Sequence, residues 1–333
     1  MMVPPGAQAR LTYLLPIRAA TPPDPELTRY LRDVSGWCDL LIVDGSGPEV
    51  FAAAHAAWAS FARHVPPEPS RRCANGKVWG VLTGLDLAES EVVVIADNDV
   101  RYGPEELAAV VAALDSADLV VPQNVFVAAD GRLPWHARWD TARTLLNRAT
   151  GGDFPGTLAV RVAAVRRAGG YRGDVLFENL ELMRTVRAAG GVVRRVDDVY
   201  VARRPPTTHH FLGQRVRQAY DELARPARLA VSLAVVPAVA VAALRRRRML
   251  LALAAAPMAL AEVGRRRASG REHFPGSSSL LAPAWVLERG ACAWLALAAQ
   301  ARGGATYAGG RLVVAASRPA ELRRRVAATP PVA

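Results

Sequence analysis

The chain has 333 residues, enough for about two domains, and its hydrophobic content of 51% comes mainly from Ala, Val and Leu, since aromatic residues make up only 6%. The formal net charge of +12 favours an anionic partner, such as a phosphate-bearing substrate or a lipid surface. No zinc-finger spacing and no basic strand interleaved with aromatic residues accompanies this charge, so we do not expect a nucleic-acid partner.

The cysteines and the N-terminus indicate where the protein works. Cys38, Cys73 and Cys292 are few and widely spaced, which argues against a disulfide framework or a zinc site and fits a reducing compartment. The first ten residues show no basic segment followed by an apolar one, so we expect no signal peptide. The sequence therefore predicts a catalytic part in the cytoplasm.

The first half of the chain alternates strand and helix patterns. Expected strands cover 11–17, 38–43, 92–96 and 119–127, and expected helices cover 24–34, 50–63, 76–88 and a segment that begins at Pro104. This alternation predicts a mostly parallel sheet with helices on both faces.

Two carboxylates follow the most apolar of these strands. Asp97 and Asp99 come directly after the β-branched run 92–95. In an open α/β sheet, ligands bind at the carboxyl ends of strands, and carboxylate oxygens hold hard cations that bridge to phosphates. The alternative is a strand that ends in an Asp-rich turn without function, because Asp-x-Asp has many chance matches.

Two further turns carry candidate residues. Asp44 opens the turn Asp44-Gly45-Ser46-Gly47, in which small residues allow the backbone to approach a ligand closely. Asn75-Gly76-Lys77 opens a helix, and Lys77 is the only lysine in the chain. A specific need for a compact ammonium group and chance are equally good explanations of this lysine.

The next segments return to the same alternation. We expect a helix over 135–148, a Gly-rich loop over 151–157, a strand over 158–160, helices over 162–168 and 175–188, strands over 192–196 and 199–201, and a helical run over 209–223. Glu178 and Glu181 lie three residues apart and should share a helix face. They are either a catalytic pair or a solvated surface pair.

In this order, the motifs resemble those of family 2 glycosyltransferases with a GT-A fold. The matching segments are Pro16, Asp44-Gly45-Ser46, Asn75-Gly76-Lys77, Asp97-Asn98-Asp99, Glu178-Asn179 and Gln214-Arg215-Val216-Arg217-Gln218. The resemblance covers roughly residues 10–222. Lipid-directed members such as ceramide glucosyltransferase look most similar, because apolar segments follow the last motif.

The resemblance implies an α/β GT-A catalytic domain, Rossmann-like with a mostly parallel sheet, and an inverting, metal-dependent sugar transfer to an acceptor hydroxyl. The expected donor is a nucleotide-diphosphate sugar and the expected cation is Mg²⁺ or Mn²⁺. Asp99 holds the cation and Asp97 contacts the ribose or the metal. Donor binding further involves Pro16, Arg18, Asp44, Lys77, Gln214, Arg215 and Arg217.

Two positions depart from the family pattern. The family's acidic motif is usually Glu-Asp, with the Asp as general base, but this chain has Asn179, which cannot accept a proton. Glu178 is then the best candidate base, with Asp174 and Glu181 behind it. The last motif ends in Gln218 instead of Trp, and Tyr220 would replace that aromatic platform only partly.

The adjacent histidines His209 and His210 have two explanations. His210 is a candidate metal ligand, as one His is in some GT-A enzymes. A pair exposed on a loop is at least as good an explanation.

The last third of the chain changes in composition. Apolar stretches cover 229–244, 249–263 and 280–301, and Arg245–Arg248 separate the first two. The first two stretches are shorter than the roughly 20 residues of a full membrane span. They either lie along or dip into the inner leaflet, or cross it with snorkelling flanks. A buried hairpin of a soluble domain is the remaining alternative.

These patterns divide the chain into a GT-A domain over 10–222, hydrophobic membrane-associated helices over 223–302 and a short tail over 303–333, with 327–333 expected to be disordered. The expected partners are the donor, a lipid- or polyprenyl-linked acceptor and the cell membrane, with the catalytic domain on the cytoplasmic side. Two other functions stay open: a catalytically inactive membrane scaffold, which Asn179 favours, and a nucleotidyltransferase, for which residues 16–19 lack the Gly-rich phosphate loop.

Overall fold

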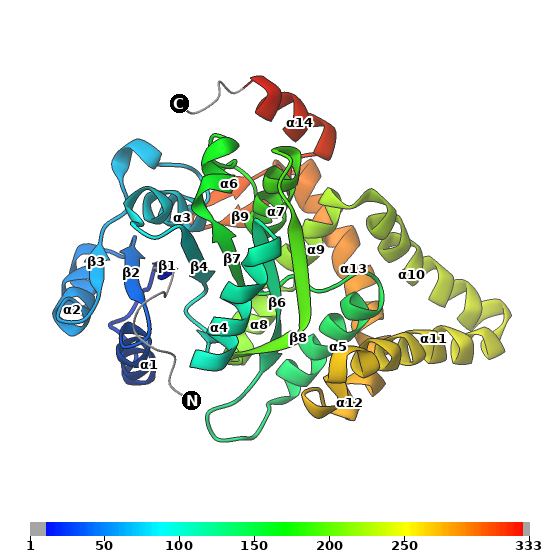
Figure 1. Cartoon of the computed structure of the whole chain (residues 1–333). Coiled ribbons are helices and arrows are strands. Elements are labelled where there is room, and N and C mark those ends of the chain that lie inside the picture. Colours follow the sequence, from blue (N-terminus) through cyan, green and yellow to red (C-terminus); the bar gives the residue numbers. More distant parts are fainter. Residues whose placement is uncertain (1–10, 329–333) are drawn as a thin grey trace. The chain divides into compact units, whose positions relative to one another are not determined.

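The computed structural model describes residues 11–328, which fold as two compact units (Figure 1). The first unit contains the chain up to Val121, Gly156–Val196 and the segment from Arg318 on. The second unit contains Pro122–Pro155 and Asp197–Ser317. The chain therefore passes between the units several times, whereas the sequence analysis placed one boundary near residue 222.

The first unit is built on a mixed sheet. Its strands include β1 (Leu11–Ile17), β2 (Asp39–Asp44), β3 (Arg63–Val65), β4 (Val92–Ala96), β6 (Leu119–Phe126) and β7 (Thr157–Arg161), which lie in the order β3-β2-β1-β4-β7-β6, and the short β5 (Val100–Arg101). The pairs β1–β2, β1–β4 and β2–β3 are parallel. The predicted mostly parallel sheet is confirmed, with β7 as a strand that runs antiparallel to both β4 and β6.

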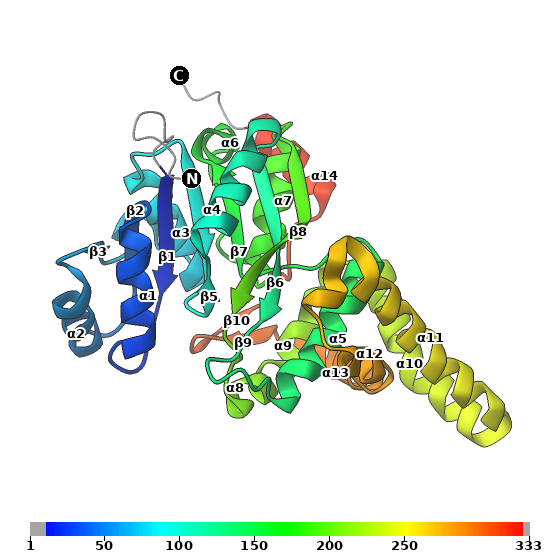
Figure 2. The ribbon, with the colours of Figure 1, turned by 60° about the horizontal axis from the view of Figure 1, so that its bottom comes forward.

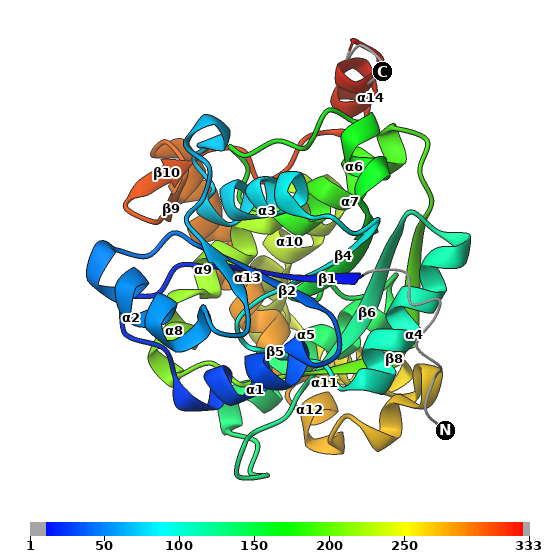
Figure 3. The ribbon, with the colours of Figure 1, turned by 60° about the vertical axis from the view of Figure 1, so that its left-hand side comes forward.

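The core strands are buried because their sequences are almost entirely apolar. All five residues of β4 are buried, and five of the six residues of β2 are buried. This pattern is typical of strands that are covered on both faces. Figures 2 and 3 show α1 (Pro25–Ser35) and α3 (Gly76–Leu87) on opposite faces of these strands. The strands β2 and β4 run in the same direction and end at the same edge of the sheet. Asp44 is the last residue of β2, and Asp97 directly follows β4.

The remaining helices of the first unit largely follow the predicted segments. They are α2 (Pro48–Trp58), η1 (Pro69–Arg71), α4 (Pro104–Ala112), η2 (Ala113–Ser116), α6 (Val162–Arg167) and α7 (Glu178–Ala188). The helix predicted over 50–63 begins and ends earlier, since Pro48 occupies its first turn and β3 follows. A three-residue strand such as β3 is too short to give a periodic signal.

The end of the chain is more ordered than the sequence suggested. The prediction of disorder over 327–333 is wrong for Ala327 and Ala328, which belong to α14 (Pro319–Ala328), and 329–333 lie outside the described residues. The helix α14 packs against α7 through the buried Leu322, and Glu321 accepts a hydrogen bond from Arg172. An isolated helix of about ten residues is only marginally stable in water. We therefore expect α14 to depend on its packing against α7.

The second unit is mostly helical. It contains the end of β6, most of β8 (Val193–Arg203), the helices α5 (Trp135–Ala149), α8 (Thr208–Gly213), α9 (Arg215–Tyr220), η3 (Asp221–Ala224), α10 (Pro226–Arg245), α11 (Arg247–Arg266), η4 (Arg267–Glu272), α12 (Gly276–Leu280) and α13 (Ala282–Ala301), and the hairpin of β9 (Ala305–Tyr307) and β10 (Gly310–Leu312). The strands predicted over 192–196 and 199–201 form the single strand β8. The strands β9 and β10 pair antiparallel, with Gly310 opposite Tyr307.

A buried arginine holds the second unit together. Arg148 is 2% exposed and donates to the Gln123 side chain, the Tyr200 hydroxyl and the carbonyl oxygens of Asp197, Gly264 and Arg267. These acceptors belong to four elements of the unit, namely β6, β8, α11 and η4. Because a buried guanidinium must satisfy its donors, Arg148 fixes the end of α5 against the end of α11.

The contact between α5 and α11 depends on a glycine. A Cβ built on Gly264 would lie 1.9 Å from the carbonyl oxygen of Leu145. The backbones of the two helices therefore approach too closely for any side chain at this position.

We expect Gly264→Ala to destabilise the protein, because the added methyl group forces two packed backbones apart. Overpacking of this kind costs about 1–3 kcal/mol, measurable as a shift in the urea midpoint. Gly276→Ala is the matched control, since nothing lies within 4 Å of the Cβ built there. Equal midpoints for the two variants would contradict the close approach of α5 and α11.

Candidate functional site

The first unit brings three charged side chains together beyond the end of β4. Lys77 is the second residue of α3, Asp97 directly follows β4, and Glu178 is the first residue of α7. The ammonium nitrogen Nζ of Lys77 lies 2.6 Å from Oδ1 of Asp97 and 2.8 Å from Oε1 of Glu178. One cation therefore joins the first aspartate of the Asp-x-Asp turn to the predicted general base.

The electrostatics of this cluster favour the charged form of the lysine. Burial alone would lower the pKa of Lys77, but the Coulombic attraction of Asp97 and Glu178 outweighs it and raises that pKa. The three side chains are only partly exposed, at 18%, 26% and 13% for Lys77, Asp97 and Glu178. Partial burial strengthens the attraction relative to a pair on the surface.

Asn75 positions two of these elements at once. Its side-chain oxygen caps α3 by accepting hydrogen bonds from the amides of Lys77 and Val78, at 3.0 and 3.3 Å. Its side-chain nitrogen donates to the carbonyl of Val175, at 2.8 Å, and its amide donates to the carbonyl of Gly173. Asn75 is fully buried, so the start of α3 and the segment that leads into α7 are held in a fixed relation.

The backbone of Gly156, in the loop that precedes β7, fixes the start of the Asp-x-Asp turn. The amide of Asp97 donates to the carbonyl of Gly156 at 2.8 Å, and a Cβ on Gly156 would lie 2.6 Å from Oδ2 of Asp97. Asp99 lies two residues further on, before β5 (Val100–Arg101). Within 11–328, no group of three or more His, Cys, Asp or Glu side chains is arranged to hold a metal ion.

Two carboxylates suffice for a cation that also binds its substrate. Mg²⁺ is usually held by one or two carboxylates, with waters and substrate phosphates completing the shell. Asp97 and Asp99 offer that donor set, so the residues present fit a cation that the donor diphosphate helps to bind. His210 lies in the second unit, and nothing in the contacts of that unit makes it a ligand.

Asp44 lies in a buried polar chain at the end of β2. Its Oδ1 accepts from the amide of Ser46 at 2.8 Å, and its Oδ2 lies 3.1 Å from Nε2 of His64. Nδ1 of His64 lies 3.2 Å from Nδ1 of His55. Burial would raise the pKa of Asp44, but the hydrogen bonds from His64 and Ser46 outweigh it, and that pKa is lowered.

Pro16 and Arg18 lie at the C-terminal end of β1. Pro16 is buried against α3, where a Cβ on Gly80 would lie 3.0 Å from the Cβ of Pro16. Arg18 is exposed just past the end of the strand. The structure thus gives Pro16 a packing contact, while Arg18 remains accessible to a ligand.

The three carboxylates proposed as the base differ in their surroundings. Asp174 is paired with Arg172, whose hydrogen bonds lower the pKa of Asp174. Glu181 is fully buried, so it does not share a solvated face with Glu178. Lys77 contacts Oε1 of Glu178 at 2.8 Å, and the Glu178 side chain is 13% exposed. Of the three carboxylates, Glu178 is the one that contacts Lys77, and its role as the base stays a prediction.

Residues 39–168 match the sequence profile of the family described as "Glycosyl transferase family 2". The matched stretch contains Asp44, Lys77 and both aspartates of the Asp97-Asn98-Asp99 turn. Residues 39–168 thus form a glycosyltransferase family 2 domain. The predictions of a glycosyltransferase and of a GT-A fold class are thereby confirmed, while the lipid-directed subtype stays a prediction. A search of curated protein sequences found no match.

Solved glycosyltransferase structures are similar to the chain at low identity. Mannosyltransferase PcManGT from Pyrobaculum calidifontis, in complex with GDP-Man and Mn²⁺, has 19% identity and a TM-score of 0.48, over 91% of this chain and 78% of that one. Glucosyl-3-phosphoglycerate synthase from Mycobacterium tuberculosis, with Mn²⁺, UDP and phosphoglyceric acid, has 20% identity and a TM-score of 0.41, over 62% and 74%. S. aureus TarS 1-349 with UDP-GlcNAc has 15% identity and a TM-score of 0.40, over 61% and 60%. Likenesses of this size carry no argument about the substrate of this glycosyltransferase.

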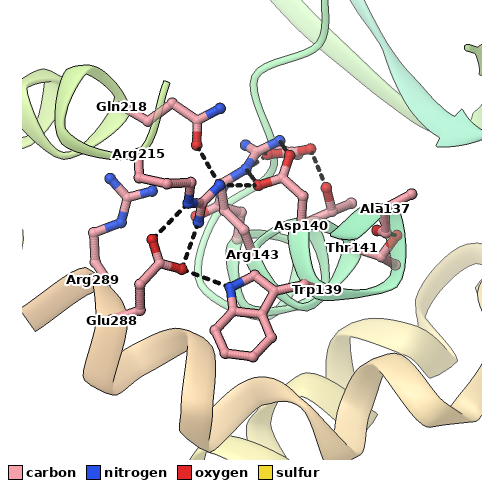
Figure 4. A network of polar contacts seen from close by, with 12 residues as sticks. Ala137, Trp139, Asp140, Thr141, Arg143, Arg215, Gln218, Glu288 and Arg289 are labelled. Carbon is pink, nitrogen blue, oxygen red and sulfur yellow. Dashed lines mark hydrogen bonds and ion pairs between the residues drawn. The ribbon is translucent and has the colours of Figure 1, made fainter. Parts of the chain in front are cut away.

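The second unit of the glycosyltransferase uses Arg215 for an internal network (Figure 4). Arg215 is 6% exposed, and its guanidinium donates to both carboxylate oxygens of Glu288, to Oδ1 of Asp140 and to Gln218. Asp140 is also bound to Arg143, and Trp139 donates to Glu288. The N–H groups of the Arg215 guanidinium are therefore already bound to acceptors within the protein. For this reason we leave Arg215 out of the nucleotide-sugar site and treat it as a structural residue.

The neighbours of Arg215 are likewise engaged within the second unit. Arg217 donates to the side-chain oxygen of Gln214 at 2.9 Å and lies over the ring of Tyr307. His210 is exposed in the middle of the short helix α8. Tyr220 is buried, and its hydroxyl donates to the carbonyl of Val313 and to Gln300. The suggestion that Tyr220 serves as an acceptor platform is therefore wrong.

His64 is the site residue that sequence reasoning missed. Its side chain is fully buried, stacks on Phe51 with ring centroids 4.5 Å apart, and holds Asp44. A single His in a three-residue strand gives no motif. Only the structure shows that β3 pairs with β2, Ile42 opposite His64, which places the imidazole beside Asp44, a predicted donor-binding residue.

We expect His64→Phe to lower the free energy of unfolding by about 1–3 kcal/mol at neutral pH, because the buried Asp44 loses a hydrogen-bond donor. The lowered pKa of folded Asp44 means that this stabilisation is present above the unfolded pKa of about 3.9 and is lost as the pH falls through the folded pKa. Urea unfolding at neutral and acid pH measures the difference between the proteins. His55→Phe keeps both contacts of Asp44 and is the control. A deficit of the same size at both pH values would contradict this account.

Proposed function

We propose that this glycosyltransferase moves a sugar, with inversion, from a nucleotide-diphosphate sugar to an acceptor hydroxyl, with a divalent cation, Mg²⁺ or Mn²⁺, bound beside the donor. The observation that carries the proposal is the contact of Lys77 with both Asp97 and Glu178, at 2.6 and 2.8 Å. This contact places Asp97, which is suited to the diphosphate end of the donor, and Glu178, which is suited to the acceptor hydroxyl, on either side of the same ammonium group.

The donor end of the site needs positive charge. When the sugar C1–O bond breaks, the diphosphate leaves with the bonding electrons and its negative charge grows. Asp97 and Asp99 would hold the cation, which supplies the charge neutralisation when bound. The ammonium of Lys77 holds Asp97 in place, and it is a second positive group beside the diphosphate. Asp44, held by His64 and Ser46, is assigned to the nucleotide base.

The acceptor end needs a base. The acceptor oxygen forms a bond to C1 on the face opposite the leaving diphosphate, and its proton passes to the carboxylate of Glu178. Asn179 cannot take this proton, because an amide is not basic, so the base moves one residue toward the N-terminus relative to the family pattern. General-base catalysis contributes about 10²–10⁴-fold to the rate.

A lipid-linked acceptor is part of the proposal. It is supported by the apolar composition of α10, the one helix among the described residues that meets the length and hydropathy criteria for a membrane-associated segment. We propose that the enzyme works at the cytoplasmic face of the cell membrane, where the acceptor lipid is held at the surface and the donor arrives from solution. An inactive scaffold is the second candidate, because Asn179 occupies the family's usual base position.

Hydrolysis of the donor separates these two candidates. We expect slow, cation-dependent hydrolysis of one of UDP-, GDP- or dTDP-sugars, lost on chelation and restored by Mn²⁺. We also expect Asp99→Asn to require more Mn²⁺ for half-maximal rate. Binding of a donor without hydrolysis would favour the scaffold, and hydrolysis unaffected by chelation would contradict the cation at Asp97 and Asp99.

We expect Glu178→Gln to lower turnover by about 10²–10⁴-fold, because the amide cannot accept the acceptor's proton. Donor affinity, measured by calorimetry, should change little. Asp174→Asn is the matched control: its carboxylate already pairs with Arg172, so turnover should stay near that of the unmodified enzyme. If D174N loses turnover and E178Q keeps it, the base is Asp174.

A further inference from the structure

The helices α10 and α11 form a hairpin with an unusually apolar surface. They lie side by side and extend away from the rest of the second unit (Figure 2). Leu244 is 86% exposed, Leu251 is 74% exposed and Val231 is 68% exposed. Val241, Met249, Leu260 and Val263 are exposed as well. Many large, exposed apolar side chains on one hairpin mark an interaction surface.

The hairpin is also strongly basic. Residues 226–266 contain seven arginines and one acidic residue, Glu262. Arg245–Arg248 are all exposed at the turn. At the other end, Arg265 and Arg266 both pair with Glu262. Four arginines with no acidic residue beside them in the sequence therefore stand at the tip, next to the most exposed leucines.

The spacing of the charges argues against a hairpin that crosses a bilayer. The uncharged run of α10, 229–244, has 16 residues and that of α11, 249–261, has 13. At 1.5 Å per residue they are about 24 and 20 Å long, whereas the hydrocarbon core is about 30 Å thick. A crossing would place the tip arginines or Glu262 inside the hydrocarbon, where charged side chains are strongly disfavoured.

A second copy of the chain fits this surface poorly. If two hairpins packed side by side in the same direction, the Arg245–Arg248 segments of both would lie together. Like charges repel at such close range. An anionic phospholipid bilayer satisfies both features at once. Its interface accepts apolar side chains to a depth of about 5–10 Å, and its headgroups carry the charge that the arginines lack.

We propose that the α10–α11 hairpin is a surface for anionic membranes and lies in the plane of the interface. Leu244, Leu251 and their neighbours enter the acyl boundary, and Arg245–Arg248 contact lipid phosphates. This inference extends the membrane location proposed above. It does not depend on the reaction, so the two can fail separately.

Flotation of the full chain with vesicles tests the proposal. We expect binding to vesicles of phosphatidylcholine and phosphatidylglycerol, weak binding to phosphatidylcholine alone, and a decrease with added salt. The variant R245S/R246S/R247S/R248S should bind the mixed vesicles on the order of 10³-fold more weakly, since each of the four arginines near an anionic surface contributes roughly fivefold.

The control removes the same charge elsewhere. The variant R29S/R32S/R323S/R324S changes four exposed arginines on α1 and α14 and should bind like the unmodified chain. Donor hydrolysis in detergent should be the same for both quadruple variants, so a lost reaction is not mistaken for lost binding. L244S/L251S should weaken binding to both kinds of vesicle.

Three results would overturn the proposal. Equal binding to both kinds of vesicle would remove the role of charge. Protection of the introduced thiol of R246C from a membrane-impermeant maleimide added outside the vesicles would indicate a crossing hairpin. Binding to neither kind, together with self-association that L244S/L251S abolishes, would show that a second copy covers the surface.

Discussion

The site depends on one ammonium group placed between two carboxylates. Asp97 and Glu178 come from distant parts of the chain, and without a cation between them they would repel each other. Lys77 contacts both, at 2.6 and 2.8 Å, and Asn75 fixes the helix that carries it. An arginine would be a poorer substitute, because its planar fork is larger and directional whereas an ammonium is a compact point charge. The single lysine in an arginine-rich chain is thus explained by the geometry it must satisfy.

The chain uses its other positive charges in two different ways. In the second unit, Arg148 and Arg215 are buried and bind protein acceptors, so they stabilise the packing of α5 with α11, α9 and α13. At the tip of the α10–α11 hairpin, the arginines are exposed beside leucines. The net charge of +12 is therefore no single signal of an anionic substrate. Burial decides which arginine is structural and which is left for a partner.

Much of the first unit could be predicted from the sequence, because β-branched runs, Pro at helix starts and the Asn75 cap are local signals. The antiparallel β7 and the short β3 could not, since strand direction and a three-residue strand leave no periodic pattern. Asp97, Lys77 and Glu178 were found through ordered motifs, but their mutual contact required the fold. Gln214-Arg215 shows the opposite case: a motif predicted a ligand contact, and only the three-dimensional position of Glu288 shows that the Arg215 guanidinium is already bound.

The most direct measurement uses the fact that Lys77 is the only lysine. Labelling with ¹⁵N-lysine gives a single side-chain ammonium signal, which reports on this contact alone. The account predicts a signal slowed in hydrogen exchange, still protonated above the usual lysine range because the two carboxylates raise the pKa of Lys77, and shifted by both D97N and E178Q. An ammonium that exchanges like free lysine and is unmoved by either substitution would contradict it.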